Sequence, residues 1–165
     1  MHRRYIQRAE PVMPQPPQIA IKERAQVGNP VFQHRDPVDA HPKREPLPLV
    51  RINPGELQQV IVNLLVNAAQ AMGNDGVLSV SLSQTEDKGQ AGACLCIGDT
   101  GPGIPDDNLD NLFDPFFTTK PAEGTGLGLS ISQTLIRREG GHIRARNRNS
   151  GGAAFSIWLP EVLVD

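Results

Sequence analysis

Two glycine-rich turns lie close together in the second half of this chain of 165 residues. They are Asp99–Gly103 and Gly124–Gly128, and an aromatic, threonine- and lysine-bearing segment, Leu112–Lys120, joins them. Glycine tolerates positive φ and has no side chain, so each turn lets the backbone approach a ligand closely. A glycine-rich turn that opens a helix also presents free N–H groups and the positive end of the helix dipole to an anion. The stretch Asp99–Ser130 therefore predicts a nucleotide-binding site.

An amphipathic helix is predicted upstream of these turns, from about Pro54 to Met72. Asn53 is a favourable N-cap, Pro54 suits the first helical position, and Glu56 stands three residues after the cap. Apolar residues then recur at spacings of three and four, which makes one stripe for the core. The stripe consists of Leu57, Val60, Ile61, Leu64, Leu65, Ala68 and Met72.

Another face of this helix is rich in amides, and the helix contains no Lys or Arg. Asn63 and Asn67 are one turn apart, so their side chains project side by side. Neutral oxygen ligands beside a phosphate chain suit a magnesium ion that keeps several of its waters. A solvated polar face is the alternative, and the helix by itself leaves both interpretations open.

Strands are predicted on both sides of the first glycine turn. Residues 77–84 alternate between apolar and polar, and residues 93–97 form a second strand after a polar loop. A second amphipathic helix is predicted over 126–139, followed by a closing hairpin over 142–148 and 153–159. Asp99 comes at the end of the second strand, where its carboxylate is placed to accept a hydrogen bond from a ligand amine. A loop-capping role for Asp99 is the alternative.

The first 48 residues differ in character from the rest. Nine of the fifteen prolines fall there, and together with charged residues they interrupt short apolar pieces such as Ile19–Ile21. We expect an irregular, proline-rich lead-in over residues 1–48, so that the sheet lacks an edge strand unless a short apolar piece such as Ile19–Ile21 supplies one. One folded domain is expected over residues 49–165.

Composition favours a globular protein outside the membrane. Hydrophobic residues make up 38 % and charged residues 21 % of the chain, and no apolar run approaches the roughly 20 residues that span a bilayer. The net charge is −2, and the charge asymmetry between residues 1–50 and 51–165 is too mild to indicate nucleic-acid binding. We expect a cytoplasmic protein that contacts neither nucleic acid nor membrane. Cys94 and Cys96 are two apart in a predicted strand, which favours buried, reduced thiols over a disulfide.

Four motifs in this chain resemble, in the same order, the N, first glycine, F and second glycine boxes of sensor histidine kinases. They are Asn63–Ala68, Asp99–Ile104, Leu112–Phe117 and Gly124–Leu129. Over about residues 49–160 the chain resembles the catalytic and ATP-binding domain of that family. The residues of its motifs are most similar to those of the kinases of nitrogen regulation and dicarboxylate sensing. In that subgroup, the segment that follows the dimerisation domain resembles residues 8–13.

This resemblance implies the Bergerat fold, an α+β two-layer sandwich in which helices cover one face of a mixed β-sheet and ATP binds beneath a lid. ATP and Mg²⁺ are the implied cofactors. Asp99 would receive the adenine amino group in a pocket that Gly101 and Gly103 shape. Asn67 would coordinate Mg²⁺, and the implied catalytic residues are Asn63, which supports metal and phosphates, and Lys120, which contacts phosphate. Further implied lid residues are Phe116, Phe117 and Thr118, and the implied phosphate-binding residues are Gly124, Thr125, Gly126, Leu127 and Gly128.

Asn63 distinguishes this chain from other members of the wider superfamily that it resembles. In the gyrase, chaperone and mismatch-repair ATPases, a Glu one turn before the magnesium-binding Asn activates water. An amide cannot serve as a general base near neutral pH. The sequence therefore predicts phosphotransfer to a partner, with negligible ATP hydrolysis by the chain alone.

A sensor kinase also needs an acceptor histidine on a dimerising helix, and we expect none of the four histidines to be one. These are His2, His34, His41 and His142. His34 lies in a proline-broken region that cannot build a long helical hairpin, and His142 begins a predicted strand. The resemblance thus implies a protein-histidine kinase domain whose phosphoacceptor domain is separate or missing, with a response regulator further on, and we expect a monomer. The alternatives are a non-catalytic nucleotide-binding regulatory module and a serine kinase similar to anti-sigma factors.

Overall fold

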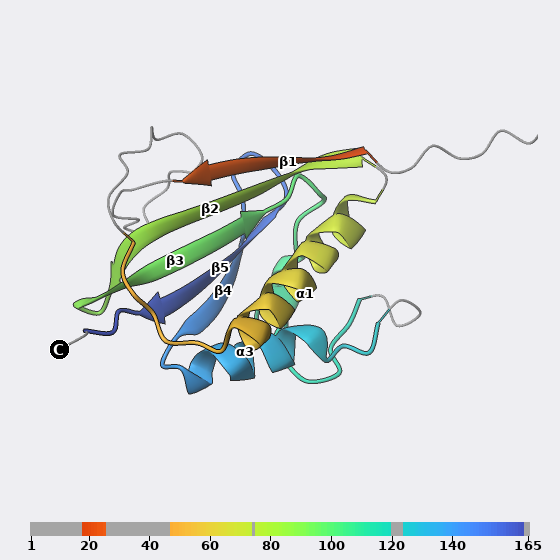
Figure 1. Cartoon of the computed structure of the whole chain (residues 1–165). Helices are drawn as coiled ribbons and strands as arrows, with labels where there is room; N and C mark the ends of the chain where they lie inside the picture. Colours follow the sequence, from red (N-terminus) through yellow and green to blue (C-terminus); the bar gives the residue numbers. More distant parts are fainter. Residues whose placement is uncertain (1–17, 26–46, 74, 120–123, 164–165) are drawn as a thin grey trace, which may run out of the picture.

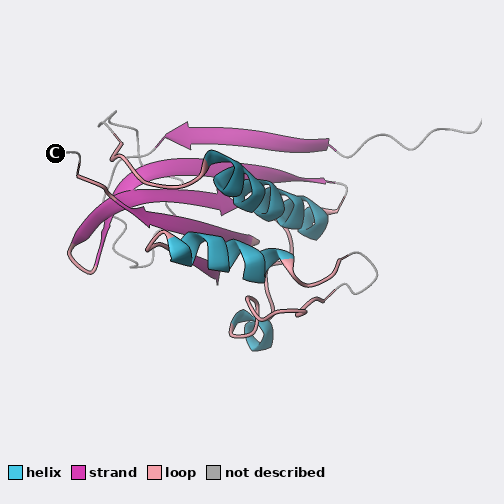
Figure 2. Cartoon of the chain, turned by 60° about the horizontal axis from the view of Figure 1, so that its bottom comes forward, coloured by secondary structure: helices cyan, strands magenta, loops and turns pink. Residues whose placement is uncertain are grey.

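The computed structural model describes residues 18–25, 47–73, 75–119 and 124–163 (Figure 1). Its strands are β1 (Gln18–Ala25), β2 (Asp75–Asp87), β3 (Gln90–Gly98), β4 (His142–Asn147) and β5 (Ala153–Pro160). Its helices are α1 (Pro54–Met72), α2 (Asp106–Leu109) and α3 (Gly128–Arg138). The strands form one five-stranded sheet, and α1 and α3 lie together on one face of it (Figure 2). The predicted α+β two-layer sandwich is confirmed.

The sheet is mixed, in the order β1-β2-β3-β5-β4. β1 runs parallel to β2, and the other neighbouring pairs are antiparallel. β2 and β3 are joined by Lys88 and Gly89, which both have positive φ (51° and 83°), as a tight hairpin turn requires. Because Gly98 at the end of β3 pairs with Ala154 of β5, the first glycine turn begins directly beside β5.

Helix α1 has the bounds that the sequence predicts. Asn53 Oδ1 accepts a hydrogen bond from Gly55 N at 2.8 Å, so Asn53 is the N-cap. The centre of the apolar stripe faces the sheet, because Val60, Leu64 and Ala68 are at most 2 % exposed. These three side chains belong to the same core cluster as buried residues of α3, β3 and β5, and this packing fixes α1 against the sheet.

The prediction of an irregular segment over residues 1–48 is wrong at Gln18–Ala25, which form β1. β1 supplies the edge strand of the sheet, with Gln18 opposite Asp75 and Ala25 opposite Leu82. This window contains no proline, so each of its backbone N–H groups is able to join the ladder. Residues 1–17 and 26–46, including the resemblance over 8–13, lie outside the described residues. The division of the chain between residues 48 and 49 stays a prediction.

Neither cysteine of β3 forms a disulfide, as predicted, and both are half-buried. Burial raises the pKa of the Cys94 thiol to about 12, and the neighbouring Cys96 contributes to this shift. A thiol with such a pKa is a poor nucleophile near neutral pH. Among the helices that the structure describes, none is both long and apolar enough to cross a membrane.

Candidate functional site

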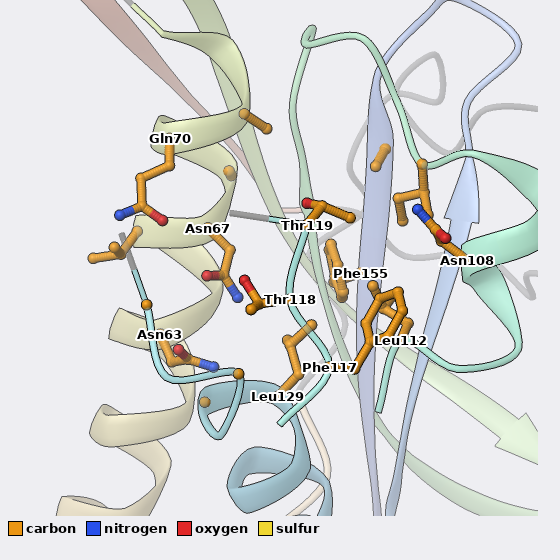
Figure 3. Close-up of a pocket in the computed structure, with 18 of the residues that line it drawn as sticks. Asn63, Asn67, Gln70, Asn108, Leu112, Phe117, Thr118, Thr119, Leu129 and Phe155 are labelled. Carbon is orange, nitrogen blue, oxygen red and sulfur yellow. The ribbon is translucent and has the colours of Figure 1, made fainter. Parts of the chain in front are cut away.

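A cavity of about 390 Å³ lies between α1, the start of α3, the loop that follows β3, and residues 117–119 (Figure 3). Most of the predicted site residues line it, although they come from separate parts of the sequence. Those that line it are Asn63, Asn67, Asp99, Gly103, Phe117, Thr118, Gly124, Thr125, Gly126 and Gly128. Those that do not are Gly101, Phe116 and Leu127, and Lys120 lies outside the described residues.

Asp99 brings a buried carboxylate to the cavity, since the residue is only 2 % exposed. Its Oδ1 accepts hydrogen bonds from Gly101 N at 2.8 Å and from Ala153 N at 3.2 Å. Both of these bonds go to the same oxygen, so Oδ2 is the atom that offers a ligand an acceptor. Gly101 does not line the cavity, and it contributes by holding the carboxylate of Asp99.

Asn63 connects the two helices at the cavity. Its Nδ2 donates to the hydroxyl of the buried Ser132 at 3.1 Å. Its Oδ1 lies close to Gly128, and a Cβ at position 128 would be 2.3 Å from this oxygen. The amide of Asn63 is therefore positioned by α3, and the absence of a side chain at Gly128 makes this approach possible.

Asn67 stands one turn further along α1 and also lines the cavity, on the side that faces Thr118 (Figure 3). The described residues contain no group of three or more His, Cys, Asp or Glu side chains that could hold a metal by themselves. Mg²⁺ prefers oxygen ligands, keeps several waters, and commonly binds through few protein groups plus substrate phosphates. The amide oxygen of Asn67 fits an ion of this kind that enters together with a nucleotide.

The second glycine turn leads directly into α3, whose N-cap Leu127 makes no side-chain capping bond. The first N–H groups of a helix have no partner within the helix, so they are able to bind an anion. Gly126 has a φ of 70°, and its carbonyl accepts a hydrogen bond from Phe116 N at 2.9 Å. A Cβ at Gly126 would be 2.5 Å from the carbonyl carbon of Phe116, so only glycine allows this contact.

The two adjacent phenylalanines of the predicted lid have different surroundings. Phe116 is 73 % exposed, has a φ of 68°, and contacts the turn at Gly126 rather than the cavity. Phe117 lines the cavity with Thr118 and Thr119 (Figure 3). Of the two side chains, Phe117 is therefore the one that a ligand in this cavity would meet.

The apolar wall of the cavity includes residues that the sequence analysis does not assign to the site. Leu112 follows α2, Leu129 is in the first turn of α3, and Phe155 is in β5. Each also belongs to the hydrophobic core or packs against it, so its sequence pattern is that of a core residue. Such a wall suits the faces of a nucleobase. Three polar lining residues were not assigned either: Gln70, Asn108 and Thr119.

The comparison with protein families matches the part of the chain that contains this cavity. The profile of the histidine kinase-, DNA gyrase B- and HSP90-like ATPases matches residues 52–163, which is more than half of the chain. The chain belongs to this family. All of the lining residues named above fall within the matched range.

Several relatives are sensor histidine kinases. Sensor histidine kinase ZraS of Escherichia coli K12 is 43 % identical over 114 residues, which cover 69 % of this chain and 23 % of ZraS. The catalytic domain of histidine kinase ThkA has a TM-score of 0.58 at 27 % identity, covering 87 % of this chain and 80 % of that domain. Full-length ShkA in complex with AMPPNP has a TM-score of 0.63 at 25 % identity, covering 88 % of this chain and 26 % of ShkA.

These comparisons confirm the resemblance to the ATP-binding catalytic domain of sensor histidine kinases and its fold. The chain spans about a quarter of the length of the curated ZraS relatives that it matches. The narrower similarity to nitrogen-regulation and dicarboxylate-sensing kinases stays a prediction.

Proposed function

We propose that this chain binds ATP with Mg²⁺ in the cavity and transfers the γ-phosphoryl group to a histidine of a separate domain. The observation that supports this most strongly is the convergence of three kinds of group. The cavity combines the carboxylate of Asp99, the paired amides of Asn63 and Asn67, and the start of α3. An acceptor for an amine, a metal ligand and donors for phosphates are what an adenine nucleotide requires.

Within this proposal each group has a defined task. Asp99 Oδ2 accepts a hydrogen bond from the adenine amino group, and Asn67 ligates Mg²⁺. Asn63 supports the metal and the phosphates, and the backbone N–H groups of residues 124–128 bind the phosphates. Lys120, beyond the described residues, is proposed as a phosphate contact. Bound Mg²⁺ would neutralise charge on the phosphates during transfer.

Asn63 cannot act as a general base near neutral pH, so we propose a histidine rather than water as the acceptor. A histidine nitrogen of the partner attacks the γ-phosphorus, the bond to the bridging oxygen breaks, and ADP leaves. The attacking imidazole brings its own lone pair, so the chain itself needs no general base. The sensor kinases among its relatives support this acceptor over water. We propose that the acceptor domain passes the phosphoryl group to a response regulator, and that the chain acts as a monomer in the cytoplasm.

The first experiment measures ATP binding by titration calorimetry with and without Mg²⁺. In Asp99→Asn the new NH₂ group faces a donor in either orientation of the amide. In one orientation it faces the ligand amine, and in the other it faces the N–H groups of Gly101 and Ala153. We expect ATP to bind about 30- to 100-fold more weakly in this variant, because a hydrogen bond to a charged acceptor is lost. Asp110→Asn, an exposed aspartate outside the cavity, is the control and should bind ATP normally.

The second experiment measures transfer of label from γ-labelled ATP to an added histidine-bearing dimerisation domain of a related sensor kinase. We expect label on that histidine, and much less label with Asp99→Asn when ATP is kept near the wild-type dissociation constant. Mg²⁺-dependent ATP binding without transfer to any such domain would instead favour a non-catalytic regulatory module. If the chain does not bind ATP at all, the proposal is wrong.

A further inference from the structure

The loop that follows β3 forms part of the cavity, although it has no regular structure of its own. We name residues 99–105 the base loop. Asp99, Gly103 and Ile104 of this loop line the cavity, and α2 begins only at Asp106. A loop without an internal hydrogen-bond ladder depends on contacts with other elements to keep its shape. The contacts that hold the base loop therefore also determine the shape of the cavity.

Asn147, the last residue of β4, holds the base loop with both ends of its amide. Its Oδ1 accepts a hydrogen bond from Ile104 N at 2.7 Å, and its Nδ2 donates to Ile104 O at 2.7 Å. Gly103 has a φ of 82°, and a Cβ there would lie 2.8 Å from Asn147 Oδ1. The glycine thus makes room for the asparagine. Asn147 is exposed and does not line the cavity.

Arg148, the next residue, holds the other end of the base loop. Its Nη1 donates to the backbone carbonyl of Asp99 at 2.8 Å. Its own N–H donates to Gly152 O at 2.9 Å, which closes the turn between β4 and β5. A Cβ at Gly152 would lie 2.0 Å from Asp99 O, so the turn and the base loop are in direct contact.

We propose that Asn147 and Arg148 are positioning residues for base recognition: they hold Asp99 and Ile104 at a fixed separation without touching the ligand. This inference rests on the proposed ATP site. Asp99 carries the acceptor for the base, and Ile104 forms part of the wall beside it. With this separation fixed, a base with an amino group aligns with Asp99 while it rests against the wall. When Ile104 is released, the base is free to shift, and the preference for an amino-bearing base falls.

The test compares ATP with inosine triphosphate, whose base lacks the exocyclic amino group that Asp99 would accept. Dissociation constants of both Mg²⁺ complexes are measured for wild type, Asn147→Ala and Asn147→Asp. Asn149→Ala is the matched control, because Asn149 is an exposed asparagine of the same turn. In Asn147→Ala we expect ATP affinity to fall about tenfold, as for the loss of one or two hydrogen bonds, and inosine triphosphate affinity to fall less than about threefold. Asn147→Asp places a carboxylate oxygen against the carbonyl oxygen of Ile104, so it should lose at least as much ATP affinity as Asn147→Ala. Asn149→Ala should match wild type.

A second readout follows the loop without any nucleotide. Hydrogen exchange of the Ile104 amide should be faster in Asn147→Ala than in wild type or Asn149→Ala, while the midpoint of global unfolding stays close to wild type. Equal losses of affinity for both nucleotides together with a lower unfolding midpoint would mean a purely structural role and would overturn the inference. Unchanged nucleotide preference and unchanged exchange would overturn it as well.

Failure of this inference differs from failure of the proposed function. If wild type binds neither nucleotide, the proposed function is wrong, and hydrogen exchange of the Ile104 amide then tests only whether Asn147 holds the base loop. If wild type binds ATP and Asn147→Ala keeps the full preference for it, the proposed function stands and the positioning role is wrong.

Discussion

The side-chain amide of Asn63 donates to the hydroxyl of Ser132 at 3.1 Å, across 69 positions of sequence. Ser132 is 2 % exposed, so this bond is partly shielded from water. It turns an asparagine of α1 towards the start of α3 and leaves its Oδ1 beside Gly128. Asn63 is therefore both a residue of the proposed phosphate site and a link between the two helices that form it.

Ser132→Ala should affect both properties of Asn63. Loss of the bond should lower the free energy of unfolding by about 1 kcal/mol, because the Asn63 amide loses a partner in a partly buried place. ATP binding should weaken severalfold, because the Asn63 side chain is then free to rotate. Chemical denaturation and titration calorimetry measure the two effects. Thr134→Ala, which removes an exposed hydroxyl bonded within α3, is the control. Wild-type ATP affinity in Ser132→Ala would show that this bond does not position Asn63.

Gly128→Ala should destabilise the domain even though alanine favours helices. The new Cβ would lie 2.3 Å from Asn63 Oδ1, so α1 and α3 must separate or Asn63 must rotate. We expect a loss of about 1–3 kcal/mol in the free energy of unfolding, as for other overpacked sites. Gly124→Ala is the control for stability, because a Cβ there meets nothing within 4 Å. Equal unfolding midpoints for the two variants would contradict this account.

The purified chain should release very little phosphate from ATP. The family resemblance implies that Asn63 stands where the gyrase and chaperone ATPases have a water-activating Glu, and the amide of Asn63 cannot accept a proton from water near neutral pH. A coupled phosphate-release assay over several hours measures the rate, with Asp99→Asn as the background. Steady turnover by wild type that Asn63→Ala abolishes would show that Asn63 activates water after all.

Stability should fall in mild acid because of His142. This side chain stacks on Trp158 at 5.3 Å between ring centroids, and burial lowers its pKa, with Arg144 adding to the shift and Asp87 opposing it. In this range the unfolded chain binds more protons, since its histidine keeps the ordinary pKa of about 6.5. The stability that neutral His142 contributes is therefore present above about pH 6.5 and is lost as the pH falls through the lowered value.

Denaturant titrations from about pH 8 down to about pH 5 measure this dependence, and His142→Gln is the comparison because it has no proton to gain in this range. The free energy of unfolding of wild type should decrease more steeply between these limits than that of His142→Gln. Parallel curves for the two proteins would exclude His142 as the cause.

Local sequence predicts much of this domain. The bounds of α1 follow from the N-cap Asn53, the proline after it and the apolar stripe, all of which act within a few residues of one another. The alternation in β2 and the glycine turns are local in the same sense. The predicted neighbourhood of Asn63, Asn67 and Asp99 rested on family resemblance, and the fold brings all three to one cavity.

Other features depend on contacts between segments that are far apart in sequence. β1 is a strand because β2 offers it a ladder, although the prolines around it suggest an irregular segment. Phe117 lines the cavity and Phe116 does not, and Phe116 has a positive φ and binds Gly126 through its backbone. In the sequence, Asn147 is only the end of a predicted strand. Its hydrogen bonds to the backbone of Ile104 form only in the folded chain. Helices and turns are governed by bonds between near neighbours, whereas an edge strand and the walls of a cavity exist only once remote segments have packed together.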